Sequence, residues 1–378
     1  MKISSPVLCV VGARPNFMKM AAVLPPLGAV PDPLPTLLIH TGQHYGAAMK
    51  ETFFQELGMP VPDEDLEVGS GSHAVQTAEI MQRFEPVLDR RQPRAVLVVG
   101  DVNSTIACAL TAVKKGIPVI HVEAGLRSFD RTMPEEINRL LTDQIADLLF
   151  ATEREAVAQL QREGIAPEKI HFVGNVMIDT LRRLLPRAPA PERVVSRLTG
   201  GAPWSMDHGY GLVTLHRPAN VDQPAVLGSL LATLGRAARE LPLIFPLHPR
   251  TRQAVAKAGL EAALQTPGLL ATPPLSYLEM LGLLRSARVV LTDSGGLQEE
   301  TTALGIPCLT LRDNTERPIT VIQGTNTLVG TDPSRIATAL AGILDGGGKD
   351  GRVPELWDGR AGERIAAILK ARLGNGRG

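Results

Sequence analysis

Short, uninterrupted runs of apolar residues recur along the chain, separated by longer segments in which apolar residues return every three or four positions. Such runs are typical of strands buried on both faces of a parallel sheet, and the longer segments are typical of amphipathic helices. In the first half the runs cover residues 6–12, 36–40, 95–100, 118–122, 147–152 and 170–174, with helices expected over 15–29, 46–57, 72–91 and 103–115. This alternation predicts a parallel sheet with helices on both faces.

A Pro- and Ala-rich segment, residues 184–195, interrupts the pattern and is predicted to be a linker. The alternation then resumes, with runs at 209–216, 241–248, 268–272, 287–293, 306–311 and 325–330. The prediction is an α/β protein of two doubly wound Rossmann-like domains, residues 1–183 and 196–360, facing a central cleft. Residues 361–378 follow, and 361–374 are expected to form an amphipathic helix.

Composition narrows the class of partner. The 378 residues include 39 Lys plus Arg and 39 Asp plus Glu, so there is no long-range field for a polyanion, and no nucleic acid is expected. Cys9, Cys108 and Cys308 lie far apart in apolar surroundings, which predicts buried free thiols in a reducing compartment. We find no apolar run long enough to span a bilayer and no signal peptide, so a cytoplasmic protein without a membrane partner is expected.

Polar residues that follow each strand are the candidates for function, because ligands of open α/β sheets bind beyond the carboxyl ends of the strands. After the first run, Gly12 permits a tight turn and Pro15 can open a helix, with Arg14 and Lys19 beside its N-terminus. This cluster suits a phosphate, although two solvated surface cations would give the same spacing. The turn is not GxGxxG, so a dinucleotide cofactor is not expected.

Two consecutive strands end in carboxylates, Asp101 and Glu123. A right-handed crossover between them would place the two strand ends side by side or nearly so. Paired carboxylates in a cleft can divide acid and base roles. Alternatively, Asp101 caps the helix that follows it, and Glu123 pairs with Arg127.

The segment "TMPEEINRLLTDQIADLL" predicts a helix that opens at Pro134 and carries Glu135 and Glu136 in its first turn. Acids stabilise a helix N-terminus without any catalytic role, and the spacing does not say which one faces a site. The stripe expected to be buried consists of Ile137, Leu140, Leu141, Ile145 and Leu148.

In the second half, two runs end in histidine followed closely by arginine: His216 with Arg217, and His248 with Arg250. A lone histidine is usually structural, but two at strand ends of one domain favour a site. Neither lies at ligand spacing from Cys, His or carboxylate, so no metal is expected.

The strongest single motif is "LTDSGGLQEE", residues 291–300. Ser294, Gly295 and Gly296 would place backbone N–H groups and a hydroxyl at a helix start, which favours an anion. Beyond the next run, "LRDNTERP" adds Arg312 and Arg317. Residue chemistry alone therefore fits either a nucleotide-sugar enzyme or a generic phosphate-binding enzyme.

Seven motifs occur in an order that resembles the UDP-N-acetylglucosamine 2-epimerase family: "GARPNFMKMAAV", "TGQHY", "HVEAGLRSFDRTMPEEINRLLTD", "GNVMIDT", "TLHRPANVD", "PLHPRT" and "LTDSGGLQEE…LRDNTERP". The resemblance runs from about residue 6 to about residue 345. It implies the GT-B-type architecture, with the C-terminal helix returning to the first domain, and usually a homodimer. It also implies elimination of UDP across C1–C2 of the sugar, giving 2-acetamidoglucal, followed by re-addition with C2 inverted.

The resemblance assigns roles residue by residue. It implies catalytic roles for Asp101, Glu123, Glu135 and His216, without saying which group removes the C2 proton. The UDP-sugar would contact Arg14, Lys19, Leu275, Met280, Ser294, Gly295, Gly296, Glu300 and Arg317, with Glu300 on the ribose and Leu275 and Met280 at the uracil. Asp313 and His248 are weaker candidates, and Glu299 is expected only to stabilise its helix start.

Two features depart from the family. Regulated members bind a second substrate molecule through a "QHRxx" turn and an upstream Arg, whereas here Tyr45 stands in that turn and no Arg occurs from 15 to 82. We therefore expect no activation by substrate.

A hydrolysing epimerase, which releases UDP and N-acetylmannosamine, shares nearly all these residues and remains an alternative function. So do a GT-B-type glycosyltransferase and a non-catalytic nucleotide-sugar sensor.

Overall fold

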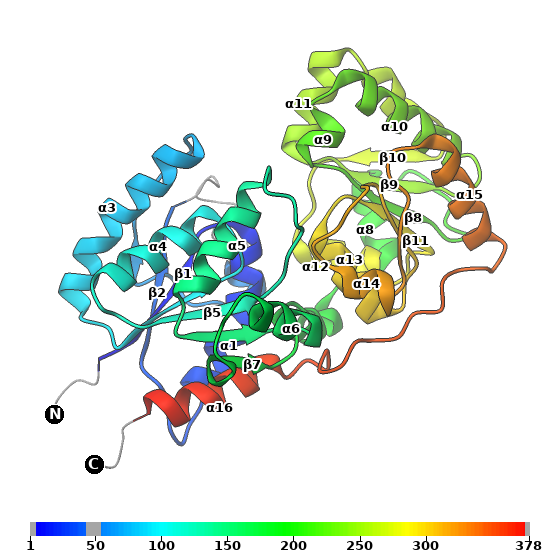
Figure 1. Cartoon of the computed structure of the whole chain (residues 1–378). Coiled ribbons are helices and arrows are strands. Elements are labelled where there is room, and N and C mark those ends of the chain that lie inside the picture. Colours follow the sequence, from blue (N-terminus) through cyan, green and yellow to red (C-terminus); the bar gives the residue numbers. More distant parts are fainter. Residues whose placement is uncertain (1–4, 43–53, 375–378) are drawn as a thin grey trace. The chain divides into compact units, whose positions relative to one another are not determined.

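The computed structural model describes residues 5–42 and 54–374, and the chain divides into two compact units. The first unit comprises residues 1–183 together with 355–378, and the second comprises 184–354. Figure 1 shows a parallel sheet flanked by helices in each unit. The two doubly wound Rossmann-like folds predicted from the alternating pattern are confirmed.

The first unit is built on a seven-stranded parallel sheet with β4 at its centre, and β1 lies between β2 and β4. In spatial order the strands are β3 (Glu64–Asp65), β2 (Thr36–His40), β1 (Val7–Val11), β4 (Ala95–Val99), β5 (Val119–Ala124), β6 (Leu148–Ala151) and β7 (Ile170–Phe172). All six runs predicted in this half are strands, and within residues 5–42 and 54–183 the one strand missed is the two-residue β3. Strands β4 and β5 pair directly, so the ends that carry Asp101 and Glu123 are neighbours, as expected.

Helices cover this sheet, and one of them comes from the C-terminal end of the chain. They are α1 (Arg14–Gly28), α3 (His73–Arg91), α4 (Asn103–Lys114), α5 (Pro134–Ile145), α6 (Arg154–Arg162), α7 (Val176–Leu184) and α16 (Ala361–Leu373), with the 3-10 turn η1 (Pro167–Lys169). Helix α16 packs against α1 (Figure 1). The Asp179 carboxylate accepts hydrogen bonds from the first backbone N–H groups of α16. The predicted helix at 46–57 lies largely outside the described residues.

The second unit has a six-stranded parallel sheet of the same winding. Its strands, in spatial order, are β10 (Leu269–Thr272), β9 (Leu243–Pro246), β8 (Gly211–Thr214), β11 (Val289–Thr292), β12 (Cys308–Thr310) and β13 (Asn326–Leu328). Its helices are α8 (Pro191–Leu198), α9 (Pro218–Val221), α10 (Pro224–Ala237), α11 (Pro249–Ala258), α12 (Tyr277–Leu284), α13 (Gly295–Leu304), α14 (Pro318–Ile322) and α15 (Pro333–Leu344), with the 3-10 turns η2 (Leu185–Arg187) and η3 (Glu261–Gln265).

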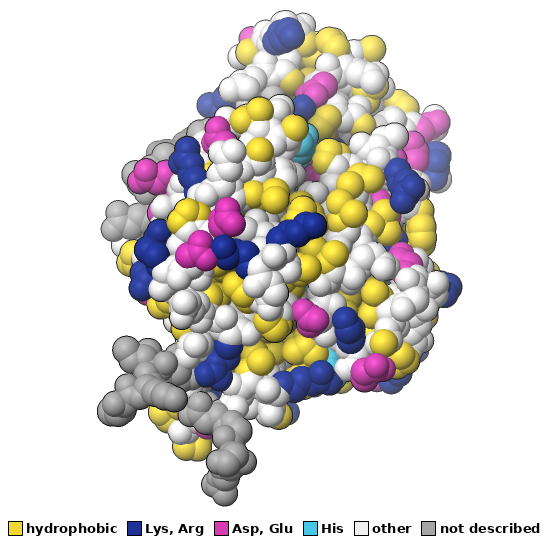
Figure 2. All heavy atoms as spheres, turned by 60° about the vertical axis from the view of Figure 1, so that its left-hand side comes forward, with side chains coloured by type: hydrophobic (Ala, Val, Ile, Leu, Met, Phe, Trp, Pro, Cys, Tyr) yellow, Lys and Arg dark blue, Asp and Glu magenta, His cyan; other side chains and the backbone are white. Residues whose placement is uncertain are grey.

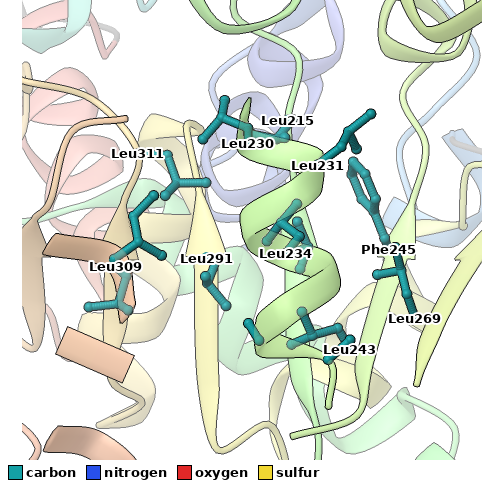
Figure 3. Close-up of a cluster of buried hydrophobic side chains, with 14 of the residues drawn as sticks. Leu215, Leu230, Leu231, Leu234, Leu243, Phe245, Leu269, Leu291, Leu309 and Leu311 are labelled. Atoms are coloured by element: carbon teal, nitrogen blue, oxygen red, sulfur yellow. The ribbon is translucent and has the colours of Figure 1, made fainter. Parts of the chain in front are cut away.

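The core of the second unit explains why its strands are continuous apolar runs. Figure 3 shows leucines of α10 beside Leu243 and Phe245 of β9 and Leu291 of β11, all in one buried cluster. Since helices cover both faces of such a sheet, successive strand residues are all buried and need not alternate with polar ones.

The segment 184–195, predicted to be a linker, instead forms η2 and the first turns of α8. Val194 and Val195 are buried, and α8 packs against α12 within the second unit. Prolines stand near the start of both helical pieces, where a missing backbone N–H is harmless, so they do not indicate irregular chain here.

The apolar stripe predicted for α5 is wrong in part. Ile137 and Leu141 are exposed, whereas Glu136, Arg139 and Asp143 of the same helix are buried. The period of the apolar residues is helical, but a polar network at the end of the sheet takes the inner face of the helix.

The surface charges and the cysteines are arranged as the composition predicts. Lys and Arg side chains lie interspersed with Asp and Glu over the described residues of the face in Figure 2. Cys9, Cys108 and Cys308 are buried free thiols, and burial raises the pKa of each. Among the described helices, none is long and apolar enough to cross a membrane.

Candidate active site

Glu123 and Lys19 form a buried ion pair at the carboxyl end of the first sheet, with Nζ 2.6 Å from Oε1. Glu123 has φ of 72°, and the register of β5 against β6 shifts at this residue, so Glu123 sits in a bulge that turns its side chain off the strand. Gly100, at the end of β4, leaves room for the ammonium: a Cβ there would lie 2.6 Å from Nζ. Strained backbone at a charged strand end is typical of a functional position.

Arg127, one candidate partner of Glu123, is instead committed elsewhere. Its guanidinium bonds Asp143 at 2.7 Å and both carboxylate oxygens of Glu163. Asp143 also accepts from His121 Nδ1 at 2.6 Å, and His121 Nε2 lies 2.8 Å from the Gly100 carbonyl. Burial alone would raise the pKa of Asp143, but the charges and hydrogen bonds of His121 and Arg127 hold that pKa below its usual value. This network fixes the β4 and β5 ends together.

Asp101 is half-buried and pairs with Arg139 through Nη1 and Oδ2. It does not cap α4, whose N-cap residue is Val102. Arg139 also bonds Glu136 at 2.7 Å, and Glu136 accepts hydrogen bonds from two backbone N–H groups of the loop before α5. Of the two acids that open α5, Glu136 therefore supports the loop and Arg139.

Glu135 is the half-buried neighbour of Glu136 on the first turn of α5. Since Glu136 is held by Arg139 and the loop, Glu135 is left as the candidate catalytic acid of this turn. Arg14 is also half-buried and is the first residue of α1, whereas the Lys19 ammonium is engaged by Glu123. The first unit thus brings Asp101, Glu123 and Lys19 to adjacent strand ends.

In the second unit, His216 follows β8 and is held by Asp293, which follows the neighbouring strand β11. His216 Nδ1 lies 3.0 Å from Asp293 Oδ1, and the backbone N–H groups of His216 and Arg217 also donate to this carboxylate. Burial alone would raise the pKa of Asp293, but the hydrogen bond and charge of His216 and these backbone donors hold it below its usual value. The ring is partly exposed, so Nε2 is the atom suited to proton transfer.

The SGG turn forms the start of α13, with Ser294 as its N-cap residue. The first N–H groups of a helix have no partner within it and attract an anion. Ser294 makes no capping hydrogen bond to α13, whose residues are all described, so its hydroxyl is not used by the helix. Gly295 leaves room for a close neighbour, because a Cβ there would lie 2.4 Å from Glu316 Oε1 and would displace that side chain.

Both glutamates of the motif are buried and have different partners. Glu300 Oε1 accepts a hydrogen bond from the Tyr277 hydroxyl at 2.8 Å. Glu299 lies 3.0 Å from Arg317 Nε, so its role is a buried ion pair, more than the favourable helix-start charge expected from the sequence. That pair also engages Arg317, a predicted nucleotide contact.

The remaining predicted contacts lie around α12 and the ends of β9 and β12. Leu275 is buried and Met280 is half-buried, on either side of the α12 N-cap Ser276. His248 is exposed; its Nδ1 caps α11 by accepting from Arg250 N, and its ring centroid lies 5.4 Å from that of His216. Asp313 is exposed.

Sequence reasoning missed Asp293, Tyr277 and Arg139. The signal for Asp293 was present, since it is a charge placed directly after a buried run, beside the glycines that drew attention. Tyr277 and Arg139 lie on helices and meet their partners only through tertiary packing. Within the described parts of the chain, no cluster of three His, Cys, Asp or Glu side chains could hold a metal ion.

The fold of two doubly wound parallel sheets agrees with the comparison with known families. The family model of UDP-N-acetylglucosamine 2-epimerases matches residues 32–370. The chain belongs to the UDP-N-acetylglucosamine 2-epimerase family, whose members are isomerases that act on carbohydrates.

Individual relatives show how close the match is. The UDP-N-acetylglucosamine 2-epimerase of Methanococcus maripaludis is 42% identical over 341 residues, covering 89% of this chain and 90% of the relative. The UDP-2,3-diacetamido-2,3-dideoxy-D-glucuronate 2-epimerase of Pseudomonas aeruginosa is 40% identical over 370 residues, covering 96% and 99%. The crystal structure of Methanocaldococcus jannaschii UDP-GlcNAc 2-epimerase in complex with UDP-GlcNAc and UDP superimposes with a TM-score of 0.88 at 39% identity, covering 97% and 99%.

Proposed function

We propose that this protein interconverts UDP-N-acetylglucosamine and UDP-N-acetylmannosamine by elimination and re-addition. A base removes the C2 proton while the C1–O bond breaks and its electron pair leaves with UDP, giving 2-acetamidoglucal. UDP then adds back through the same oxygen at C1, and an acid returns a proton to the opposite face of C2. Atoms and charge balance without an oxidant, reductant or water.

The observation that carries this proposal is the group of charges at the neighbouring ends of β4 and β5. Glu123 is buried against the Lys19 ammonium, and Asp101 lies at the next strand end against Arg139. Burial of charge is costly, so such a cluster is expected where proton transfer uses it. We assign the proton transfers at the sugar to Asp101, Glu123 and Glu135 of this unit.

The second unit supports nucleotide binding and one further proton transfer. Asp293 orients His216 as the carboxylate of a His–Asp pair orients a general acid–base. The N-terminus of α13 suits the diphosphate. Taken by itself, Arg14 of the first unit carries a charge that suits a phosphate. Glu300, with its Tyr277 contact, suits the ribose hydroxyls, and Leu275 and Met280 are assigned to the uracil.

Proton NMR of the products formed from UDP-N-acetylglucosamine in D₂O tests the proposal. Epimerisation gives UDP-N-acetylmannosamine with deuterium at C2, and deuterium also enters C2 of the remaining substrate. Free N-acetylmannosamine plus UDP would identify a hydrolysing enzyme instead. No exchange at C2 without an acceptor would favour a glycosyltransferase, and binding without any turnover would favour a sensor.

A second substrate is favoured by one specific observation. The Pseudomonas aeruginosa relative, which is named for a diacetamido-glucuronate, matches almost the whole of both chains at nearly the same identity as the UDP-N-acetylglucosamine enzymes. That sugar also bears an acetamido group at C2, so the same elimination applies to it. Comparing kcat/KM for the two UDP-sugars decides which is the substrate.

Two further properties belong to the same proposal. The turn with Tyr45 lies outside the described residues, and its sequence leads us to propose that substrate does not activate the enzyme. Hyperbolic initial rates are expected, and sigmoidal rates in UDP-N-acetylglucosamine would contradict this. The homodimer implied by the family is tested by light scattering of the full chain.

A further inference from the structure

Three side chains from two segments of the second unit meet beside the first turn of α13: Arg217 from the segment after β8, and Arg312 and Glu316 from the loop after β12. Glu316 comes from the loop after β12, and its Oε1 would lie 2.4 Å from a Cβ on Gly295. Arg312 Nη2 lies 2.8 Å from Glu316 Oε2, and Arg217 Nη2 lies 3.4 Å from Glu316 Oε1. One carboxylate thus holds two guanidinium groups beside the turn that the proposed function assigns to the diphosphate.

Both guanidinium groups have hydrogen-bonding capacity left over. The Arg312 side chain is only 9% exposed, and among the described residues no acceptor meets its buried Nη1. Arg217 Nε is likewise buried without an acceptor in the described part of the chain. A buried donor left unsatisfied is unfavourable, and more so when it is charged, so each N–H is expected to meet an acceptor when the ligand is bound.

Arg317, the arginine that the motif "TERP" favoured, is arranged differently. Its Nε faces Glu299 at 3.0 Å, in a pair whose two side chains are both almost fully buried. Arg312 and Arg217 share a single carboxylate instead. Glu316 is ionised in this setting: burial alone would raise its pKa, but the charges of the surrounding arginines hold the pKa well below its usual range.

We propose that Arg312 and Arg217 bind the diphosphate at the N-terminus of α13, and that Glu316 is the positioning residue that holds both guanidinium groups there. The inference rests on the proposed function, because it takes a nucleoside diphosphate as the ligand. Guanidinium groups suit this ligand, since their planar donors match phosphate oxygens. Gly295 serves two purposes in this arrangement: it admits the ligand to the helix N–H groups and makes room for Glu316.

Isothermal titration of the full chain with UDP and with uridine tests the proposal, because only UDP carries the diphosphate. R312Q is expected to weaken UDP binding about 10- to 100-fold and uridine binding less than about twofold. R312K keeps the charge but loses the planar donors, so it is expected to fall between wild type and R312Q. R250Q is the matched control, since Arg250 is a half-exposed arginine of the same unit paired with Asp222, and it should leave both affinities unchanged.

E316Q separates positioning from other roles. If Glu316 holds the arginines, E316Q weakens UDP binding about tenfold while uridine binding stays within about twofold of wild type. Tighter UDP binding by E316Q would show that Glu316 competes with the diphosphate, which overturns its positioning role. Equal losses of UDP and uridine in R312Q, or no loss of UDP, would overturn the assignment of Arg312. A wild-type protein that binds neither ligand would instead contradict the proposed function itself.

Discussion

The buried Lys19–Glu123 pair makes the sharpest prediction for the first unit, because it can be tested by stability without any assumption about turnover. Nζ and Oε1 lie 2.6 Å apart, and the two side chains are 5% and 2% exposed. Removing one member of such a pair leaves the other charge buried and costs about 3–5 kcal/mol. Replacing both by neutral groups of similar size costs much less, because neither charge then remains.

The perturbation is a double-mutant cycle of K19M, E123Q and K19M/E123Q. Each single variant is expected to lower the melting temperature of its unit by about 6–20 °C, at 2–4 °C per kcal/mol for a unit of this size. The double variant is expected to lose at least about 2 kcal/mol less than the sum of the singles. This coupling is the quantity that the short buried contact predicts.

Tryptophan fluorescence can follow the first unit alone. The chain has two tryptophans, and Trp357 is buried in the first unit, where its indole donates to the Thr152 carbonyl. A W204F background therefore leaves one reporter. K115M is the matched control, because Lys115 is a lysine of the same unit in a surface ion pair with Asp89, and its loss should barely move the transition. Single-variant losses that add within about 0.5 kcal/mol would refute the buried pair.

Three further predictions concern groups whose partners the structure identifies. D293N should lower kcat about 100- to 10,000-fold with a smaller change in KM, because His216 loses the carboxylate that orients it; an unchanged kcat in a steady-state assay would contradict this. Burial alone would raise the pKa of Glu136, but the backbone donors and Arg139 lower it. The ionised Glu136 therefore stabilises the fold above about pH 4.5, and this stabilisation is lost as the pH falls through the lowered folded-state pKa. Accordingly, E136Q should lower the melting temperature by roughly 4–10 °C at pH 7, and this gap should narrow below about pH 4; a gap independent of pH would be evidence against the charge effect. E300Q should weaken UDP binding about tenfold but leave 2′,3′-dideoxy-UDP within about twofold, as measured by titration, and equal losses for both nucleotides would remove Glu300 from the ribose.

Much of the fold was predictable because its signal is local. A strand covered on both faces must be apolar throughout, so the runs ending near Asp101, Glu123, His216 and Asp293 marked the strands and their carboxyl ends. Doubly wound topology then places such ends at one edge of a sheet. The structure confirms this, because β4 pairs directly with β5, and β8 pairs directly with β11.

The partners of the charged groups could not be predicted from the sequence, because a charge can pair with any opposite charge that the packing brings near. Lys19 and Glu123 are 104 positions apart, and Arg127, the nearer candidate, turned to Asp143. For the same reason the predicted inner face of α5 was wrong in part: Leu141 and Ile137 are exposed, and polar side chains are buried on the inner face instead.

For this protein, the sequence by itself determined the element order, the two sheets, the family and the set of residues at the strand ends. Only the tertiary structure decided which of those residues are held and by what: Glu136 by Arg139, His216 by Asp293, and two arginines by Glu316. The reason is physical. Backbone pattern and apolar period act over a few residues, whereas ion pairs and hydrogen bonds depend on distances that exist only after the chain has packed.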